Sequence, residues 1–169
     1  MTLTDTDLDQ LIHDRAIRLI LLGPQQRPIW EASPSPLHQM VVRTIERSIE
    51  PVPNEGGECA CYSLADTYFR LPDNSLVRPD IAILCRVPPR QRAALTVVPA
   101  AVIEIVSPGY HTKDYDDLPP IYLANGIPDV LVVDIERGIL THITPENRQE
   151  LPLPAVRMLS NGCRCLIPE

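Results

Sequence analysis

Residues 99–106 read PAAVIEIV, a short apolar run that contains one glutamate, Glu104. Runs of this kind, rich in Val, Ile and Ala and shorter than a helix, are typical of central β-strands that are covered on both faces. A second run of the same type occupies residues 129–134. Between the two runs, a helix-like stretch at 119–125 is followed by Gly126, a residue type that commonly closes a helix. The order strand, helix, strand predicts an α/β domain with a mixed, strand-rich sheet.

An amphipathic helix is the clearest element on the N-terminal side of this unit. It opens at Ser35 and Pro36, residue types that favour a helix start, and it stops before Pro51. Apolar residues recur within it at steps of three and four, which predicts one buried face. The residues of this expected face are Leu37, Met40, Val41, Ile45 and Ile49.

The remaining segments predict further strands. Residues 61–71 are rich in Tyr, Thr and Phe, and turn residues separate them from an apolar partner at 76–85, so the two runs form an expected hairpin. The other expected elements are a short helix followed by an extended segment within 7–22, and strand-like pieces at 139–143 and 156–166.

The composition narrows the class of protein. A chain of 169 residues fits one domain, which we expect to span residues 1–169. Its 19 prolines exclude a helical bundle or a coiled coil, because proline lacks the backbone donor that a helix interior needs. The net charge of -7 argues against a nucleic-acid coat protein, whose affinity comes from an excess of Lys and Arg. The chain shows neither a signal-peptide pattern nor an apolar run long enough to cross a bilayer, so we expect a cytoplasmic protein.

The five cysteines are odd in number, which suits reduced thiols in a cytosol better than a disulfide framework. Cys59 and Cys61, together with Cys163 and Cys165, could supply four thiolates to a zinc ion. The spacing of one residue within each pair is shorter than that of most zinc sites. We therefore favour cysteines that pack as small apolar side chains, with a zinc site as the less favoured reading.

Two carboxylates stand where apolar residues are expected. A carboxylate inside a buried strand costs several kcal/mol unless it is paired, hydrogen-bonded or bound to a metal, so Glu104 needs compensation. Asp80 starts a second apolar run, and two carboxylates on adjacent strands would form an oxygen site that suits Mg²⁺. Other readings remain: Asp80 could cap the turn after Pro79, and Glu104 could face water on an edge strand or pair with Arg78.

Three further polar residues near these strands have two readings each. Lys113 follows a turn at 107–109 and could reach back to the carboxylates, or it could be a solvated lysine. His38 could face the end of the sheet as a proton carrier, but we favour a residue at the helix start that is satisfied by solvent. Glu31 is more readily read as structural or exposed than as part of a site.

Several short motifs follow one another in a characteristic order. They are Glu31, the helix start with Ser35, Pro36 and His38, residues 78–80, residues 102–107, Asp114, Tyr122, residues 126–127 and residues 130–134. This order resembles the Uma family of restriction-endonuclease-like proteins, in the PD-(D/E)xK nuclease superfamily, over roughly residues 30–134. The resemblance implies an α/β (α+β) restriction-endonuclease-like fold, a mixed central sheet flanked by helices. It also implies that Asp80 and Glu104 are the metal-binding carboxylates.

The lysine of the motif departs from this pattern. In the superfamily a lysine lies two residues after the glutamate, where this chain has Val106. Many Uma-like chains carry a lysine four residues before the helix tyrosine instead, but that position is Leu118 here. A variant form with a Gly-Tyr-x-x-Lys-Asp motif and a Pro-Pro pair before the tyrosine is matched by residues 109–114 and 119–120. The resemblance therefore assigns the lysine role to Lys113.

The resemblance and the carboxylate pair together favour an endonuclease that depends on Mg²⁺ or Mn²⁺ and hydrolyses DNA phosphodiester bonds. Asp80 and Glu104, with the main-chain carbonyl of Ile105, would bind the metal, which activates a water molecule. Lys113 would orient that water and stabilise negative charge. The candidate auxiliary residues are Glu31, His38 and Asp114.

The chain's charge is uneven, which bears on a DNA substrate. Residues 78–92 carry a local charge of +3 in an acidic protein, so Arg86, Arg90 and Arg92 are candidate DNA-binding residues. The alternative function is a restriction-endonuclease-like module that has lost turnover and serves in binding or assembly, because the lysine after Glu104 is missing. A two-fold homodimer is the expected assembly, since symmetric dimers are the commonest oligomers.

Overall fold

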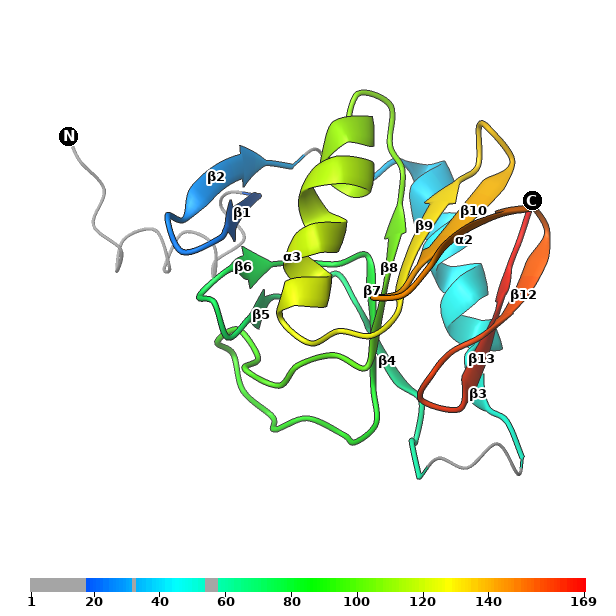
Figure 1. Cartoon of the computed structure of the whole chain (residues 1–169), viewed down its shortest axis with the longest axis horizontal. Coiled ribbons are helices and arrows are strands. Elements are labelled where there is room, and N and C mark those ends of the chain that lie inside the picture. Colours follow the sequence, from blue (N-terminus) through cyan, green and yellow to red (C-terminus); the bar gives the residue numbers. More distant parts are fainter. Residues whose placement is uncertain (1–17, 32, 54–57) are drawn as a thin grey trace.

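A six-stranded sheet lies at the centre of the computed structural model, which describes residues 18–31, 33–53 and 58–169 (Figure 1). Its strand order is β11-β10-β9-β8-β7-β4. The strands are β4 (Tyr62–Ala65), β7 (Ile81–Leu84), β8 (Ala101–Ile105), β9 (Val130–Asp134), β10 (Ile139–Ile143) and β11 (Arg148–Pro152). The β8–β9 pair is parallel, and every other neighbouring pair of this sheet is antiparallel.

The connection between β8 and β9 contains a helix, as a parallel pair requires. A π-helical turn (Lys113–Asp117) leads into α3 (Leu118–Ala124). Gly126 then adopts a φ of 88°, a left-handed conformation that glycine takes without strain, and its N–H bonds the carbonyl of Leu123. The predicted order of strand, helix and strand is therefore confirmed.

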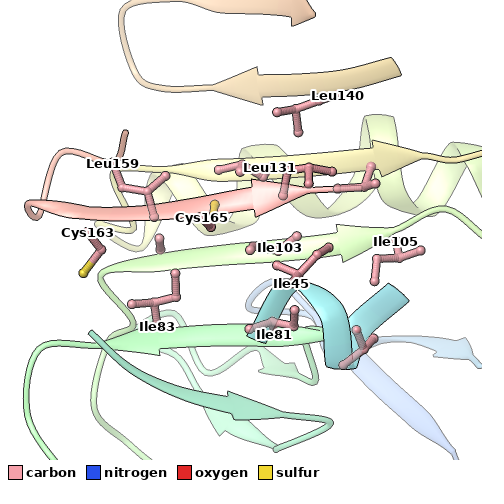
Figure 2. Close-up of a cluster of buried hydrophobic side chains, with 14 of the residues drawn as sticks. Ile45, Ile81, Ile83, Ile103, Ile105, Leu131, Leu140, Leu159, Cys163 and Cys165 are labelled. Carbon is pink, nitrogen blue, oxygen red and sulfur yellow. The ribbon is translucent and has the colours of Figure 1, made fainter. Parts of the chain in front are cut away.

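Alternation along β7 and β8 divides the core into two layers. Ile81 and Ile103 face α2 (Pro36–Ser48), and Figure 2 shows Ile45 of that helix packed near them. Ala82 and Val102 face the opposite side, where they pack with α3. Because side chains alternate along a strand, Glu104 shares the α3 side with Val102.

Two smaller sheets complete the layers. On the α2 side lies a three-stranded sheet in the order β12-β13-β3, and on the α3 side lies a four-stranded sheet in the order β2-β1-β6-β5. Their strands are β12 (Ala155–Met158), β13 (Cys163–Ile167), β3 (Glu50–Pro51), β2 (Arg27–Trp30), β1 (Leu19–Leu22), β6 (Leu76–Val77) and β5 (Phe69–Arg70). No helix in the described part of the chain is long and apolar enough to span a membrane.

The face of α2 differs from the predicted one. His38, Val41, Val42 and Ile45 are buried, whereas Leu37 and Met40 are exposed. The spacing of the apolar residues fits two overlapping faces, and packing on the sheet selects the face that begins at His38.

The strand predictions hold with changes in their extent. The expected hairpin of 61–71 with 76–85 is present, but it is broken into two strand pairs, β4 with β7 and β5 with β6. β1 confirms the extended segment within 7–22, while the helix expected before it lies outside the described residues. β11 was not predicted, because its sequence, RQELP, is polar and mostly exposed.

The expectation of separate reduced thiols is wrong for four of the five cysteines. Cys59 is bonded to Cys85, and Cys61 is bonded to Cys163, while Cys165 is a free and buried thiol. Sequence spacing could not show these pairs, because they join residues 26 and 102 positions apart.

Candidate active site

Asp80 and Glu104 lie side by side at one end of the central sheet. β7 and β8 pair Ile81 with Ile103, and continuing this antiparallel register by one residue sets Asp80 opposite Glu104. Asp80 is fixed there because its Oδ2 accepts a hydrogen bond of 2.7 Å from the N–H of Ile105. The expectation of two carboxylates on adjacent strands is confirmed. β8 is an interior strand, so the reading of Glu104 as an edge residue facing water is wrong.

The Glu104 carboxyl is buried, with 1% of the residue exposed. Tyr122, which α3 directs toward the sheet, donates a hydrogen bond from its hydroxyl to Glu104 Oε1. Burial and the nearby Asp80 charge raise the pKa of Glu104, and these effects outweigh Lys113 and the tyrosine hydrogen bond, so the pKa lies well above its usual value. The carboxylate form therefore lacks sufficient positive charge around it.

Lys113 enters the site from the turn before α3. Its Nζ lies 3.2 Å from Glu31 Oε1 and 3.2 Å from Asp114 Oδ1. Burial alone would lower the pKa of Lys113, but the negative charges of Glu104, Asp114 and Glu31 raise it by a larger amount. The pKa of Lys113 is therefore higher than its usual value, and the ammonium form is favoured. The reading of Lys113 as a solvated residue is wrong, because only 14% of its side chain is exposed.

Asp114 is a second buried carboxyl of the site, beside Glu104, with 1% of the residue exposed. Burial raises its pKa to about 6, although the Lys113 ammonium opposes this shift. Asp114 and Glu104 are thus both harder to ionise than a carboxyl in water, for the same physical reason.

Arg78 does not pair with Glu104, in contrast to one of the readings of the sequence. Its Nε and Nη2 donate to Glu31 Oε2 at 2.9 and 2.7 Å, and its Nη1 donates to Asp66 Oδ1 at 2.6 Å. Glu31 is consequently buried between Arg78 and Lys113. The reading of Glu31 as exposed is wrong, and its carboxylate belongs to the candidate site, because it contacts Lys113 and lines the same pocket.

His38 faces the site, so the prediction that solvent satisfies it is wrong. Its Nε2 lies 3.1 Å from Asp80 Oδ1, and its Nδ1 has no partner among the described residues. Ser35 caps the helix by accepting the N–H of His38 at 3.1 Å, and Pro36 fixes the first turn. Ser35 and Pro36 thereby determine where α2 begins, and with this start the His38 side chain points toward the sheet.

These side chains surround a pocket of about 40 Å³. A water molecule needs roughly 10–15 Å³, so the pocket has room for a small ion together with part of its hydration shell. Glu104 is buried and does not line the pocket. The lining residues used in the argument are Glu31, His38, Arg78, Asp80, Lys113 and Asp114.

The donor set fits a hard divalent cation. Asp80 offers carboxylate oxygens and lines the pocket together with Ile105, whose main-chain carbonyl is the third predicted ligand. Glu104 offers its carboxylate from the position opposite Asp80 on the neighbouring strand and does not line the pocket. Oxygen ligands of this type are preferred by Mg²⁺ and Mn²⁺. The raised pKa values of Glu104 and Asp114 also indicate a deficit of positive charge, which a divalent cation would correct.

The arginines predicted to bind DNA lie elsewhere. Arg86, Arg90 and Arg92 are exposed, and they belong to the loop that leaves β7 at the strand end opposite Asp80. None of the three lines the pocket, and their DNA-binding role stays a prediction.

Two contacts in this site could not be predicted directly from the sequence. Tyr122 stood out only as a residue of the family pattern, although its spacing of four from Leu118 places both on the buried face of α3. The pairing of Arg78 with Glu31 joins residues 47 positions apart and has no local signal.

The sheet, its flanking helices and the carboxylate pair define a restriction-endonuclease-like α+β fold. Among solved structures, a putative nuclease belonging to DUF820 from Anabaena variabilis ATCC 29413 is similar to this chain, with a TM-score of 0.59 and 15% identity. The similarity covers 82% of this chain and 79% of that one. The chain belongs to the Uma2 family, described as putative restriction endonuclease, whose sequence pattern matches residues 8–162. No curated protein matches the chain.

Proposed function

We propose that the protein is a metal-dependent endonuclease that hydrolyses DNA phosphodiester bonds. The observation that carries the proposal is the pairing of Asp80 with Glu104 on adjacent strands, beside a pocket that Lys113 enters. The Uma2 family and the nuclease-like fold support the same class of reaction.

Each residue of the site has a role in this proposal. Asp80, Glu104 and the carbonyl of Ile105 would hold Mg²⁺ or Mn²⁺. The bound cation would supply positive charge to the scissile phosphate and lower the pKa of a water nucleophile. His38 orients Asp80. Tyr122 orients Glu104.

Lys113 supplies the second positive charge. The carboxylates around it keep it protonated, so it donates hydrogen bonds to the attacking water or to a phosphate oxygen. Glu31 and Asp114 hold its Nζ in place, and Arg78 in turn holds Glu31.

The test is cleavage of supercoiled plasmid and of single-stranded DNA with Mg²⁺ or Mn²⁺, using wild type and Glu104→Gln purified in parallel. We expect cleavage by the wild type that a chelator abolishes, and none above background by the variant. Equal cleavage by both proteins would overturn the proposal, since an amide neither binds Mg²⁺ well nor carries the charge.

A non-catalytic binding or assembly module is the second candidate function. It is favoured by Val106, which stands where the superfamily has its lysine, and by Glu104, which is buried and does not line the pocket. Calorimetric titration with Mn²⁺ separates the two functions. A site that saturates in the millimolar range or below favours the enzyme, whereas no detectable site favours the module.

The proposal includes DNA contact through Arg86, Arg90 and Arg92. Each arginine that neutralises a phosphate raises the salt dependence of binding, so replacing it with Met lowers the slope of log affinity against log salt by about 1. Fluorescence anisotropy with labelled DNA at several salt concentrations measures this slope. An unchanged slope in all three variants would remove these residues from the DNA-binding surface.

We also propose a homodimer as the working assembly. β12 is an edge strand, and Val156, Met158 and Leu166 expose apolar side chains on β12 and its partner β13. Light scattering at working concentration checks this, and a mass near 18.9 kDa contradicts it.

A further inference from the structure

Three buried cysteine sulfurs meet at the end of the sheet opposite the candidate active site, and the sulfur of a fourth, half-buried cysteine is bonded to one of them. Cys59 and Cys61 precede β4, Cys85 follows β7, and Cys163 begins β13. The Sγ atoms of Cys59, Cys61 and Cys163 all lie within 4.8 Å of one another, and the sulfur of Cys85 is bonded to that of Cys59. Figure 2 shows Cys163 near Ile83, far from Ile105 at the other end of the core cluster.

The spacing between the two disulfides matches a tetrahedral metal site. Sγ of Cys59 and Sγ of Cys163, which are not bonded to each other, lie 3.7 Å apart. In a tetrahedral zinc site with Zn–S bonds of about 2.3 Å, neighbouring sulfurs lie about 3.8 Å apart. Opening a disulfide from about 2 Å to this distance moves each of its sulfurs by about 1 Å, which side-chain rotation can accommodate. The Cys85 sulfur, which lies outside the group of three, must also rotate toward that group.

The backbone and the packing also favour a built site. Cys61 has a φ of 51°, in the left-handed region that residues other than glycine seldom adopt. This local turn lets Cys59 and Cys61, only two residues apart, bring both sulfurs to one place. The surroundings are apolar, and Cys163 is fully buried beside Leu159, so water has little access to displace a ligand.

We propose that Cys59, Cys61, Cys85 and Cys163 bind one Zn²⁺ through four thiolates when their disulfides are reduced. A phosphine reductant brings about the reduced state: each disulfide takes two electrons from one phosphine, water supplies two protons to the thiols, and its oxygen remains on the phosphine oxide. Zinc binding then releases one proton from each of the four thiols. The metal would join the same three chain segments that the disulfides join.

Cys165 is excluded from this site although it lies two residues after Cys163. It is buried and bonded to no other cysteine, and burial raises the pKa of its thiol to about 12. It therefore serves as a matched control within the same strand.

The experiment uses the whole chain, reduced with phosphine, desalted without oxygen and titrated with Co²⁺ as the probe. We expect one Co²⁺ per chain with a thiolate-to-cobalt charge-transfer band, and its displacement by one equivalent of Zn²⁺. Four thiols should become unreactive toward a maleimide in the zinc form and react after a chelator is added. Reduced protein that shows no thiolate band, or that unfolds and does not refold with Zn²⁺, overturns the proposal.

Variants identify the ligands. Cys61→Ser and Cys163→Ser should abolish the band, whereas Cys165→Ala should keep it. If the serine variants do not fold, peptide mapping of the maleimide-labelled wild type shows which four thiols zinc protects, and a different set of four overturns the assignment. Metal held by carboxylates gives no thiolate band, so Asp80→Asn should keep the band, which separates this result from the success or failure of the nuclease proposal.

Discussion

Glu104 and Asp129 are two carboxyls with 1% of each residue exposed, at opposite ends of the parallel β8–β9 pair, and their pKa values move in opposite directions. Glu104 is the more deeply buried of the two. Burial acts against ionisation at both. Asp129 overcomes it, because His142 Nε2 lies 2.7 Å from one oxygen and the N–H of Ser160 donates to the other at 2.9 Å, so its pKa is lowered. Glu104 receives too little positive charge, so its pKa is raised.

The two carboxyls differ in whether the protein itself supplies all of their hydrogen-bond and charge partners. Arg157 Nε donates to His142 Nδ1 at 2.6 Å, which leaves the proton of His142 on Nε2, facing Asp129. This chain of donors and acceptors is satisfied within the protein. The cluster around Glu104 has more carboxylates than cations and opens onto a pocket. A completed network stabilises the fold, whereas an incomplete one is suited to receive a cation.

The largest expected effect is the loss of activity in Glu104→Gln. Removing the carboxylate proposed to bind the metal takes away several kcal/mol of charge stabilisation, so cleavage should fall by about a thousandfold or more. The free energy of unfolding should stay the same or rise, because a buried group with an unfavourable charge becomes neutral. Urea unfolding measures this second effect. A variant that is inactive and also much less stable would contradict the contrast with Asp129.

The matched replacement at the other end, Asp129→Asn, should have the opposite effect. It removes charge-assisted hydrogen bonds from His142 and Ser160, so the free energy of unfolding falls by about 2 kcal/mol. Cleavage per folded molecule should be unchanged. Urea unfolding and cleavage assays on the same preparation check both statements, and a loss of stability below about 0.5 kcal/mol would mean that the network is not structural.

Replacing Lys113, a cation of the cluster around Glu104, should lower the cleavage rate by less than replacing Glu104 does. Lys113→Met should lower cleavage by about a hundredfold, at the low end of the range expected for loss of one charge-stabilising donor. The loss of its charge also raises the pKa of Glu104 further, so the acidic limb of the pH–rate profile moves to higher pH. Arg92→Met is the control, since Arg92 lies outside the pocket and should leave that limb in place.

The fourth expected effect is on the pH dependence of stability. Asp114 titrates near 3.8 in the unfolded chain and near 6 in the folded one, so the folded state binds more protons between these values. Its contribution therefore makes stability fall as pH rises from about 4 to about 6, by at most about 3 kcal/mol. Asp129 acts in the other direction, because its stabilisation is lost as pH falls through its lowered pKa.

Asp114→Asn should flatten that fall in stability. Urea unfolding at several pH values between about 4 and about 6 measures it, with Asp129→Asn as the comparison. An unchanged slope in Asp114→Asn would show that Asp114 does not carry the charge penalty.

The sequence predicted the parts of the fold that have local causes. Apolar runs marked β8 and β9, Gly126 marked the end of α3, and Ser35 with Pro36 marked the start of α2. Which face of α2 is buried could not be predicted in this way, because Leu37 and Met40 continue the apolar spacing on a side that nothing covers.

The residues of the candidate site also separate into those with a local sequence signal and those placed by tertiary packing. The isolated carboxylates of Asp80 and Glu104 stood out because charge is unusual in an apolar run. The partners that decide their chemistry did not, because Tyr122, His38 and Arg78 reach the site through tertiary packing. The Asp129–His142 pair was missed for this reason too, since it depends on the β9–β10 register.

Glu31 has a consequence for how the protein is made. Its carboxylate binds Arg78 and Lys113, which lie 47 and 82 residues further along the chain. A growing polypeptide therefore reaches the end of synthesis of β8 with the pocket still unassembled. Two fragments made by cutting the chain in the 85–100 loop should each be inactive. Cleavage regained on mixing them would show that the fragments had associated and assembled the pocket.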